Sequence, residues 1–364
     1  MSIATGLATG KEATPELAKL AVSRAMEKAG ITTPSAVLLF LTSEFAKNPE
    51  PAIKAAAKAA ACTQVIGCSA PGIFTEEDWV LDSPAAAAMV FSDTATLSVT
   101  EKEAASLLLT FAAPNAINRT WLNHPYQPLN QPTPRFGSIS GDATGQGAFS
   151  IWQNGKGAQQ GYCEVAIQKA TSAIKASHGL KVISEPKRIS GVKQHQLLSI
   201  DDIEAVASLN AAWDKLSNQH HQPLRNQLVA IYAKEREAIA EEDDYHVATI
   251  LTSDDVGAVT LSKALEMGDW LSWALRDVNT AQVDMVKTAS KLRLSLMADP
   301  SFAMLFSCLG RGPSFYNGSD QDLELVKTLF PGLPIIGFYG NGEIAPIKGR
   351  NEILDHSAVL GLFA

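Results

Sequence analysis

The sequence contains little of what marks the more easily recognised classes of protein. Its four cysteines are scattered, with no C-x-x-C pair, so no disulfide framework or cysteine-rich zinc module is indicated. No apolar run approaches the roughly 20 residues that cross a bilayer, and the first residues do not resemble a signal peptide. No dense block of Lys and Arg occurs, and the net charge of −8 argues against nucleic-acid or anionic-membrane partners. We therefore expect a soluble cytoplasmic protein with reduced thiols and no membrane insertion.

The chain does contain an ordinary globular composition and an alternation of predicted strands and helices. With 46% hydrophobic residues over 364 positions, it can bury sizeable cores and suits two domains. Apolar runs at 36–41 and 64–68 predict strands covered on both faces, separated by an alanine-rich helix that begins after Pro49. A further helix is predicted to begin at Thr14 and end at Gly30. This order predicts parallel strands with helices packed on them.

Other segments interrupt that alternation. Residues 85–91 and 97–100 resemble strands without a full helix between them, and Asn154-Gly155 is a strong hairpin signal. The proline-rich stretch 113–137 is expected to be an irregular loop or lid. The spacing in 199–202 is that of a capping box and predicts a helix that carries Ile203. The predicted fold class is therefore α/β to α+β, with two related lobes that each contain a mixed β-sheet and packed helices.

The two ends of the chain repeat one order of elements: strand, helix, strand and glycine-rich segment. The first copy ends at 67–72, and the second passes from a strand at 302–306 through a helix at 320–330 to 337–342. Ligands of open α/β sheets tend to bind beyond the carboxyl ends of strands, and glycines allow close approach of the backbone. We therefore expect an internal duplication with a ligand-binding cleft at these segments, and a domain boundary between 178 and 189.

The same segments resemble a known family. The residues SCLGRG at 307–312, PIIGFY at 334–339 and GEI at 342–344 are similar to the "SCxGRG … PxxGFxxxGEI" pattern of FIST C-terminal domains. VIGCS at 65–69, followed by Gly72 and by Gly141-Asp142, resembles the N-terminal FIST domain, although Ile73 replaces the glutamate of the usual "GCSTAGEI". The resemblance implies a FIST N-terminal domain at 1–185 and a FIST C-terminal domain at 186–364.

The resemblance also implies a function. FIST domains are sensory input domains for small ligands, often fused to kinases, cyclases or chemotaxis modules, and some relatives resemble nitric-oxide-responsive haem proteins that control a histidine kinase. Since the two domains use up the chain, we expect it to act on a separate partner, a histidine kinase or a cyclase. An amino acid or a similar small metabolite is the expected ligand, with haem as the alternative.

The candidate ligand-binding residues lie in the two glycine-rich segments, the SCLGRG segment and one turn. They are Gly67, Cys68, Ser69, Asp142, Cys308, Arg311, Tyr339, Asn341 and Glu343. Arg311 can bind a ligand carboxylate or phosphate through two hydrogen bonds, or form an internal ion pair with Glu343. Asp142 is expected to stabilise its own turn. Because Ile73 replaces the second glutamate, the C-terminal half is expected to carry the polar recognition.

Chemistry at cysteine or histidine is the remaining alternative. Cys68 and Cys308 each follow an apolar strand, where a thiolate can serve as a nucleophile in acyl-type chemistry. Packing is the simpler interpretation, and no histidine partner lies nearby in sequence, so we predict no catalytic residue and no enzyme. Seven histidines offer haem or metal ligands, but none has zinc-site spacing, and no metal site is predicted.

Overall fold

The computed structural model describes residues 3–92, 95–98, 105–125, 132–142, 144–217, 227–239, 245–254 and 257–364. The chain forms two compact units, unit 1 from Met1–Ser177 with Met285–Ala364 and unit 2 from His178–Asp284. The expected division at 185/186 differs from this one, because C-terminal strands pair with strands of the N-terminal half and close unit 1 from two distant segments. The fold is a mixed α+β fold, as predicted. Within the described residues, no helix is long and apolar enough to span a membrane.

The described strands of unit 1 form three mixed sheets. Sheet 1 has the order β1 (Ile3–Thr9), β6 (Ala85–Phe91), β2 (Ala36–Thr42), β3 (Val65–Ala70), β10 (Ile151–Gln153), β11 (Lys156–Gly157). Sheet 2 has the order β25 (Arg350–Leu354), β24 (Glu343–Ile347), β9 (Arg135–Ile139), β8 (Leu108–Ala112), β12 (Tyr162–Gln168), β7 (Thr96–Ser98). Sheet 3 has the order β13 (Ser172–Ser177), β26 (Ala358–Phe363), β22 (Phe302–Cys308), β23 (Ile335–Gly340), β4 (Gly72–Thr75), β5 (Trp79–Leu81).

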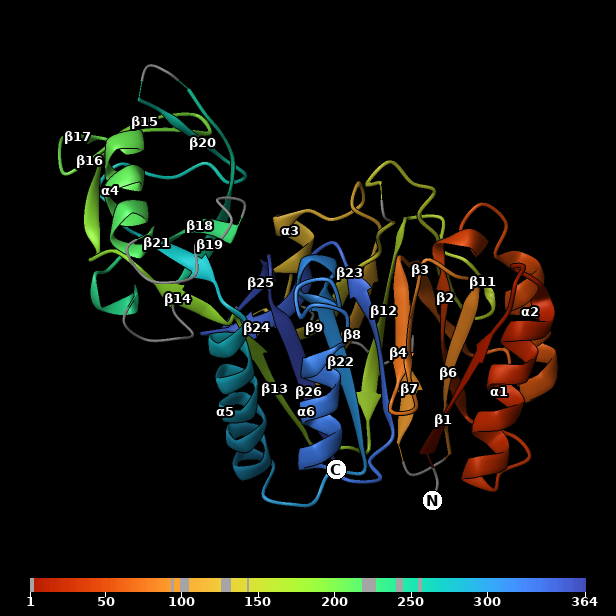
Figure 1. The fold of residues 1–364 in the computed structure, drawn as a ribbon. Helices are drawn as coiled ribbons and strands as arrows, with labels where there is room; N and C mark the ends of the chain where they lie inside the picture. Colours follow the sequence, from red (N-terminus) through yellow and green to blue (C-terminus); the bar gives the residue numbers. More distant parts are fainter. Residues whose placement is uncertain are drawn as a thin grey trace. The chain divides into compact units, whose positions relative to one another are not determined.

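Helices cover the outer faces of sheets 1 and 3. Helices α1 (Pro15–Ala29) and α2 (Glu50–Ala60) pack on sheet 1, while α5 (Val278–Leu296) and α6 (Gln321–Leu329) pack on sheet 3 (Figure 1). The sequence of strand β2 is apolar throughout because both of its faces are buried. Leu39 faces the helices, whereas Phe40 faces a central core shared by all three sheets. Gly30 ends α1 in the left-handed conformation (φ 67°), as predicted.

The predicted parallel pairs are present, since β2 pairs in parallel with β3 and β22 with β23. The hairpin at Asn154-Gly155 is confirmed by the pairing of β10 with β11. The helix predicted from the capping box begins too early: Asp201 and Asp202 form a left-handed turn (φ 47° and 60°) between β16 (Gln196–Ile200) and β17 (Ile203–Glu204), and α4 (Ala205–Ser217) follows. The proline-rich stretch contains α3 (Arg119–Leu122) and the start of β9, while 126–131 lie outside the described residues.

The three sheets of unit 1 repeat one topology. Each contains a parallel pair bordered by an antiparallel strand: β2 and β3 with β6, β8 and β9 with β12, β22 and β23 with β26. The next strand along the chain always crosses to another sheet, so β4 pairs with β23, β24 with β9, and β10 with β3. This exchange closes a cycle among the three sheets. The predicted duplication is therefore present, together with a third repeat that the sequence did not predict.

Equivalent residues of the three repeats meet at the centre of unit 1. Phe40, Phe111 and Phe306 come from β2, β8 and β22, and their ring centroids lie 5.2, 6.2 and 5.6 Å apart. Three equivalent glycines lie beside these rings: Gly67, Gly137 and Gly337. A Cβ atom added to them would lie 1.9, 1.9 and 1.8 Å, respectively, from a carbonyl oxygen of the paired strand. These glycines are required by the close packing of two strands.

Unit 2 is built around a sheet that closes on itself. Its order over the described residues is β14 (Leu180–Val182), β21 (Trp270–Arg276), β15 (Lys187–Lys193), β16, β20 (Val259–Leu261), β19 (His246–Ser253), β18 (Leu228–Ala233), and β18 also pairs with β21. Helix α4 packs against this sheet, where Leu209 and Ala212 share a core with Trp273.

Candidate functional site

The carboxyl ends of the strands that carry the glycines converge in unit 1. The Asn341 amide donates to the Ile139 carbonyl at 3.0 Å, and the Ile139 amide donates to Gly342 at 2.8 Å. The Ser140 hydroxyl donates to the Ser69 carbonyl at 2.5 Å. The two predicted glycine-rich segments meet where Gly72, the first residue of β4, pairs with Tyr339 of the antiparallel strand β23, whereas residues 67–70 belong to β3.

The first three predicted site residues lie inside strand β3. Gly67, Cys68 and Ser69 are buried, and no loop presents them to solvent. Burial, together with the neighbouring Cys163, raises the pKa of the Cys68 thiol well above its usual value. Ser69 accepts a hydrogen bond from the Ser150 amide at 3.0 Å and so ties β3 to the segment before β10. Gly67, Cys68 and Ser69 therefore contribute to the packing and hydrogen bonding of the protein interior.

Arg311 is buried and has an internal partner. Its Nε donates to Asp322 at 2.8 Å and its Nη2 to the second oxygen of that carboxylate at 3.1 Å. Nη1 and Nη2 also donate to the carbonyl and hydroxyl groups of Ser177 at 2.6 and 2.7 Å. The ion pair therefore forms with Asp322, on α6, and Glu343 is not its partner. This bidentate geometry occupies the guanidinium N–H groups of Arg311 that a ligand carboxylate would need as hydrogen-bond donors.

Three further predicted residues have separate surroundings. Tyr339 is buried and donates to Asp320 at 2.5 Å, while Asn341 is exposed and lies against Gly141. Asp142, in the loop after β9, accepts hydrogen bonds from the Thr144 hydroxyl and from two backbone amides of its own loop. Desolvation acts to raise its pKa, but these hydrogen bonds together lower it. Such bonds are those of a turn-stabilising aspartate.

Glu343 is the most unusual group at the converging strand ends. It begins β24 and is fully buried, and its Oε2 accepts a hydrogen bond from the Ser357 hydroxyl at 2.9 Å. No group within the described residues donates to Oε1. Burial raises the pKa of this carboxyl group well above its usual value, although the Ser357 hydrogen bond acts to lower it. A buried carboxyl oxygen without a donor is a candidate contact for a ligand.

Cys308 lies beside this carboxyl group, at the end of β22. Its amide donates to the Ser357 carbonyl at 2.8 Å, so β22 and the turn before β26 enclose Glu343 together. The residue is partly exposed, but burial of the thiol, followed by the effect of Glu343, raises its pKa to about 12. A thiol with such a pKa remains protonated at neutral pH and is a poor nucleophile.

The turn between β25 and β26 adds residues that the sequence did not single out as a group. Asp355 acts to raise the pKa of Glu343, and Ser357 is its hydrogen-bond donor. The turn joins the site only because β24 pairs with β25 and β26 pairs with β22. The sequence signal for it is weak, a short polar run before the apolar strand 358–363.

Histidines do not gather into a site in the part of the chain that is described. His124, His195 and His246 are exposed, and His178 is buried with its ring 5.2 Å from that of Tyr245. His220 and His221 lie outside the described residues. Among the described residues, no group of three or more potential protein ligands could hold a metal ion.

A cavity of about 470 Å³ lies at the opposite, amino ends of β22 and β23. Apolar side chains form much of its wall, among them Ile3, Phe330 and Leu333, and Arg293 and Asp299 also line it. Its volume is in the range of small-molecule sites. None of the predicted site residues lines it.

The mixed sheets and the enclosed carboxyl group define an α+β protein with a candidate small-ligand site. The chain matches the FIST N domain over residues 35–203 and the FIST C domain over residues 212–346, and it belongs to the family of proteins that carry these domains. FIST domains are in general sensory domains that bind small ligands.

Two mycobacterial relatives illustrate the similarity. "Uncharacterized protein MT0656" of Mycobacterium tuberculosis (strain CDC 1551 / Oshkosh) is 24% identical over 384 residues, which cover 100% of both chains. "Uncharacterized protein Mb0898c" of Mycobacterium bovis is 29% identical over 136 residues, which cover 37% of this chain and 35% of the relative. Neither name identifies a ligand, so haem binding stays a prediction.

Proposed function

We propose that this protein is a FIST-type sensor that binds an amino acid or a similar small amine-bearing metabolite and acts on a separate signalling partner. The observation that carries the ligand class is Glu343, a buried carboxyl group with one oxygen that no described residue satisfies. A ligand ammonium group placed against Oε1 would supply the missing donor and stabilise the ionised carboxylate. The protonated Cys308 thiol gives no support to nucleophilic chemistry, so the proposal contains no catalytic step.

Ligand entry requires a conformational change, because Glu343 is fully buried. Cys308, which lies close to Glu343, and Asn341, two residues before it in the chain, are at least partly exposed, so the segments next to the buried carboxyl group reach the surface. A ligand that binds the open arrangement better than the closed one shifts the population between them. That shift is what a partner, such as a histidine kinase or a cyclase, would detect.

Calorimetry with a panel of amino acids and small amines tests this proposal. An ammonium ligand that ionises Glu343 should release protons, measured at pH 5.5 by repeating the titration in buffers of different ionisation enthalpy. Glu343→Gln should abolish both binding and proton release. Glu352→Gln, a change to a partly exposed glutamate on β25, should alter neither. If binding survives Glu343→Gln unchanged, or if no member of the panel binds, the proposed ligand class is wrong.

A further inference from the structure

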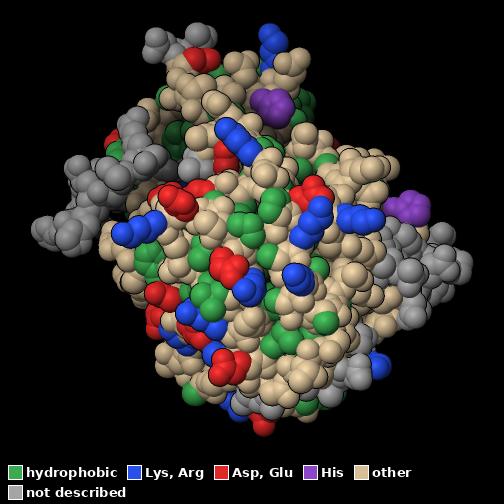
Figure 2. Space-filling view, turned by 90° about the vertical axis from the view of Figure 1, so that its right-hand side faces the viewer, with side chains coloured by type: hydrophobic (Ala, Val, Ile, Leu, Met, Phe, Trp, Pro, Cys, Tyr) green, Lys and Arg blue, Asp and Glu red, His purple; other side chains and the backbone are tan. Residues whose placement is uncertain are grey.

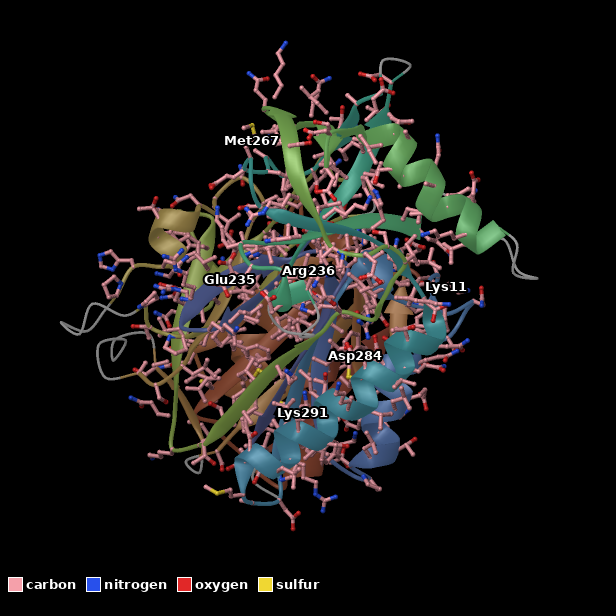
Figure 3. All side chains as sticks on the ribbon, turned by 90° about the vertical axis from the view of Figure 1, so that its left-hand side faces the viewer. Lys11, Glu235, Arg236, Met267, Asp284 and Lys291 are labelled. Carbon is pink, nitrogen blue, oxygen red and sulfur yellow. The ribbon has the colours of Figure 1, made fainter. Side chains whose placement is uncertain are left out.

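The cavity at the amino ends of β22 and β23 takes no part in the amine site proposed above. Its volume is about 470 Å³, and its lining comes from the start of β1, from the last turn of α5 with the loop that follows, and from the segment between α6 and β23. Helices α5 and α6 lie side by side and end at this edge of sheet 3; Figure 3 shows α5 from outside, with its end beyond Lys291. A space of this size can hold a small organic molecule.

Buried apolar side chains form the inner wall of the cavity. Ile3 belongs to the central core, while Phe330 and Leu333 belong to the core between sheet 3 and its helices, so their positions are held by packing. Three prolines also line the cavity: Pro300, Pro331 and Pro334. Because each proline ring fixes its own φ angle, the two lining loops lose little further freedom when a ligand binds. The cavity is therefore apolar and largely preformed.

The wall offers few hydrogen-bond donors to a ligand. The three prolines have no N–H group. The Ser301 amide donates to the Phe363 carbonyl at 2.6 Å. The Phe330 amide donates to the Val326 carbonyl at 3.0 Å, and the Leu333 amide donates to the Phe330 carbonyl at 3.2 Å. An anion that left water for this wall would find little to replace its hydration.

The two charged residues that line the cavity neutralise each other. Arg293 Nη2 lies 3.4 Å from Asp299 Oδ1, and the two side chains are 59% and 90% exposed, so this ion pair lies at the rim in contact with solvent. Each charge has the other as its partner, and the rim therefore gives no advantage to a ligand of either sign. Water inside the cavity also has few polar partners, so an apolar ligand would displace it at little cost.

We propose that this cavity is a second ligand site of unit 1, which binds an uncharged and mostly apolar small molecule. The apolar wall, the satisfied amides and the paired rim charges each favour such a ligand over an anion or an amine. Ser301 is the one uncharged polar residue among the described residues that line the cavity, so the site suits a ligand with a single polar group. The amine site at Glu343 lies at the other, carboxyl ends of the strands, and the two sites are separate.

Methyl NMR on the full-length protein, labelled at isoleucine and leucine methyl groups, tests the site with named compounds. 1-Octanol and indole serve as uncharged ligands, and octanoate and octylamine carry the same chain as octanol with a negative or a positive head group. The two uncharged compounds should shift the methyl signals of Ile3, Leu329 and Leu333, which line the cavity. Octanoate and octylamine should bind at least about tenfold more weakly than 1-octanol, because their charges must lose hydration.

Two matched variants on α6 separate the cavity from the fold. Leu329 and Leu325 are both partly buried and pack on the same core, but Leu325 is not among the described residues that line the cavity. Leu329→Gln should weaken 1-octanol binding about tenfold, whereas Leu325→Gln should leave it unchanged. Asp299→Asn removes the partner of Arg293, so it should strengthen octanoate binding several-fold without changing that of 1-octanol.

A control on another face of unit 1 excludes general effects of a lost apolar side chain. Leu20 on α1 is 41% exposed, and Figure 2 shows the face covered by α1 and α2, where charges of both signs lie among scattered apolar side chains. Leu20→Gln should change neither 1-octanol binding nor the melting temperature.

Several outcomes would overturn this second site. They are the absence of binding by both uncharged compounds, binding of octanoate or octylamine as tight as that of 1-octanol, and methyl shifts that leave Ile3, Leu329 and Leu333 unaffected. Equal weakening by Leu325→Gln, or a dimer in sedimentation equilibrium that Leu329→Gln dissociates, would also overturn it. Glu343→Gln should not affect 1-octanol binding, so a failure of the amine site and a failure of this site are distinguishable.

Discussion

Replacing Glu343 by glutamine isolates the effect of one buried carboxyl group on stability. Burial raises the pKa of Glu343 well above the ordinary value of 4.5. At pH values between 4.5 and this raised pKa, the folded protein therefore binds a proton that the unfolded chain has lost. Stability therefore falls as the pH rises through that window. Glutamine keeps an oxygen for the Ser357 hydroxyl but carries no ionisable proton, so this part of the pH dependence should disappear in the variant.

The size of this pH dependence of stability is set by a single proton, the one that Glu343 retains in the folded state. A full proton of difference changes the free energy of unfolding by about 1.36 kcal/mol per pH unit. As the pH rises above 5 we expect the wild type to lose stability relative to Glu343→Gln, by at most about 1.36 kcal/mol for each pH unit over which Glu343 stays protonated in the folded state. Asp320, whose pKa burial and the neighbouring Asp322 raise to about 6, contributes equally to both proteins and cancels in the difference.

Urea denaturation at a series of pH values measures this difference directly. The two proteins should show equal m-values and curves of unfolding free energy against pH that diverge above pH 5. Parallel curves would show that Glu343 titrates normally in the folded state. That result would refute the argument that its buried Oε1 lacks a donor and would remove the basis for the amine ligand.

Three further predictions concern packing, ion pairing and thiol reactivity. Gly337→Ala should destabilise unit 1 by more than about 3 kcal/mol, because its Cβ would lie 1.8 Å from a carbonyl oxygen of β22, whereas Gly157→Ala, which has open space, should be nearly neutral in thermal unfolding. Asp322→Ala should cost about 3–5 kcal/mol by leaving the Arg311 guanidinium buried without its carboxylate; a chemical denaturation midpoint equal to wild type would contradict this. Cys308, with its pKa raised to about 12, should react with iodoacetamide at pH 7 more than about 100-fold more slowly than a peptide cysteine. Mass spectrometry measures the rate of labelling, and a faster rate would show an accessible thiolate.

Local sequence patterns predicted most elements of the repeats at the two ends of the chain. The continuous apolar run at 36–41 became β2, covered by helices on one side and by the central core on the other. The turn chemistry of Asn154-Gly155 likewise specified a hairpin, since both residues take positive φ angles there. Where sequence reasoning failed, at 199–204, two aspartates in a left-handed turn replaced the expected helix start.

The third repeat was missed because its local signals are weak. Strands β8 and β9 are separated by a proline-rich stretch whose described residues contain one short helix, so the strand–helix–strand order is not visible in the sequence there. Its identity depends on long-range pairing, in which β24 joins β9 and β12 joins β8. Gly137 was a weak sign, since it follows one apolar residue, Phe136, whereas Gly67 and Gly337 each follow two.

The sequence by itself determined most strands and helices of the two end repeats, the mixed fold class and the resemblance to FIST domains, because apolar periodicity, caps and turn residues act over short stretches of chain. Only the tertiary structure decided what the conspicuous residues do. Gly67 and Gly337 allow strands to pack closely, Arg311 pairs with Asp322, and Glu343 is left with an unsatisfied oxygen. The physical reason is that burial and hydrogen-bond partners depend on which distant segments meet, and the exchange of strands among the three sheets sets those meetings.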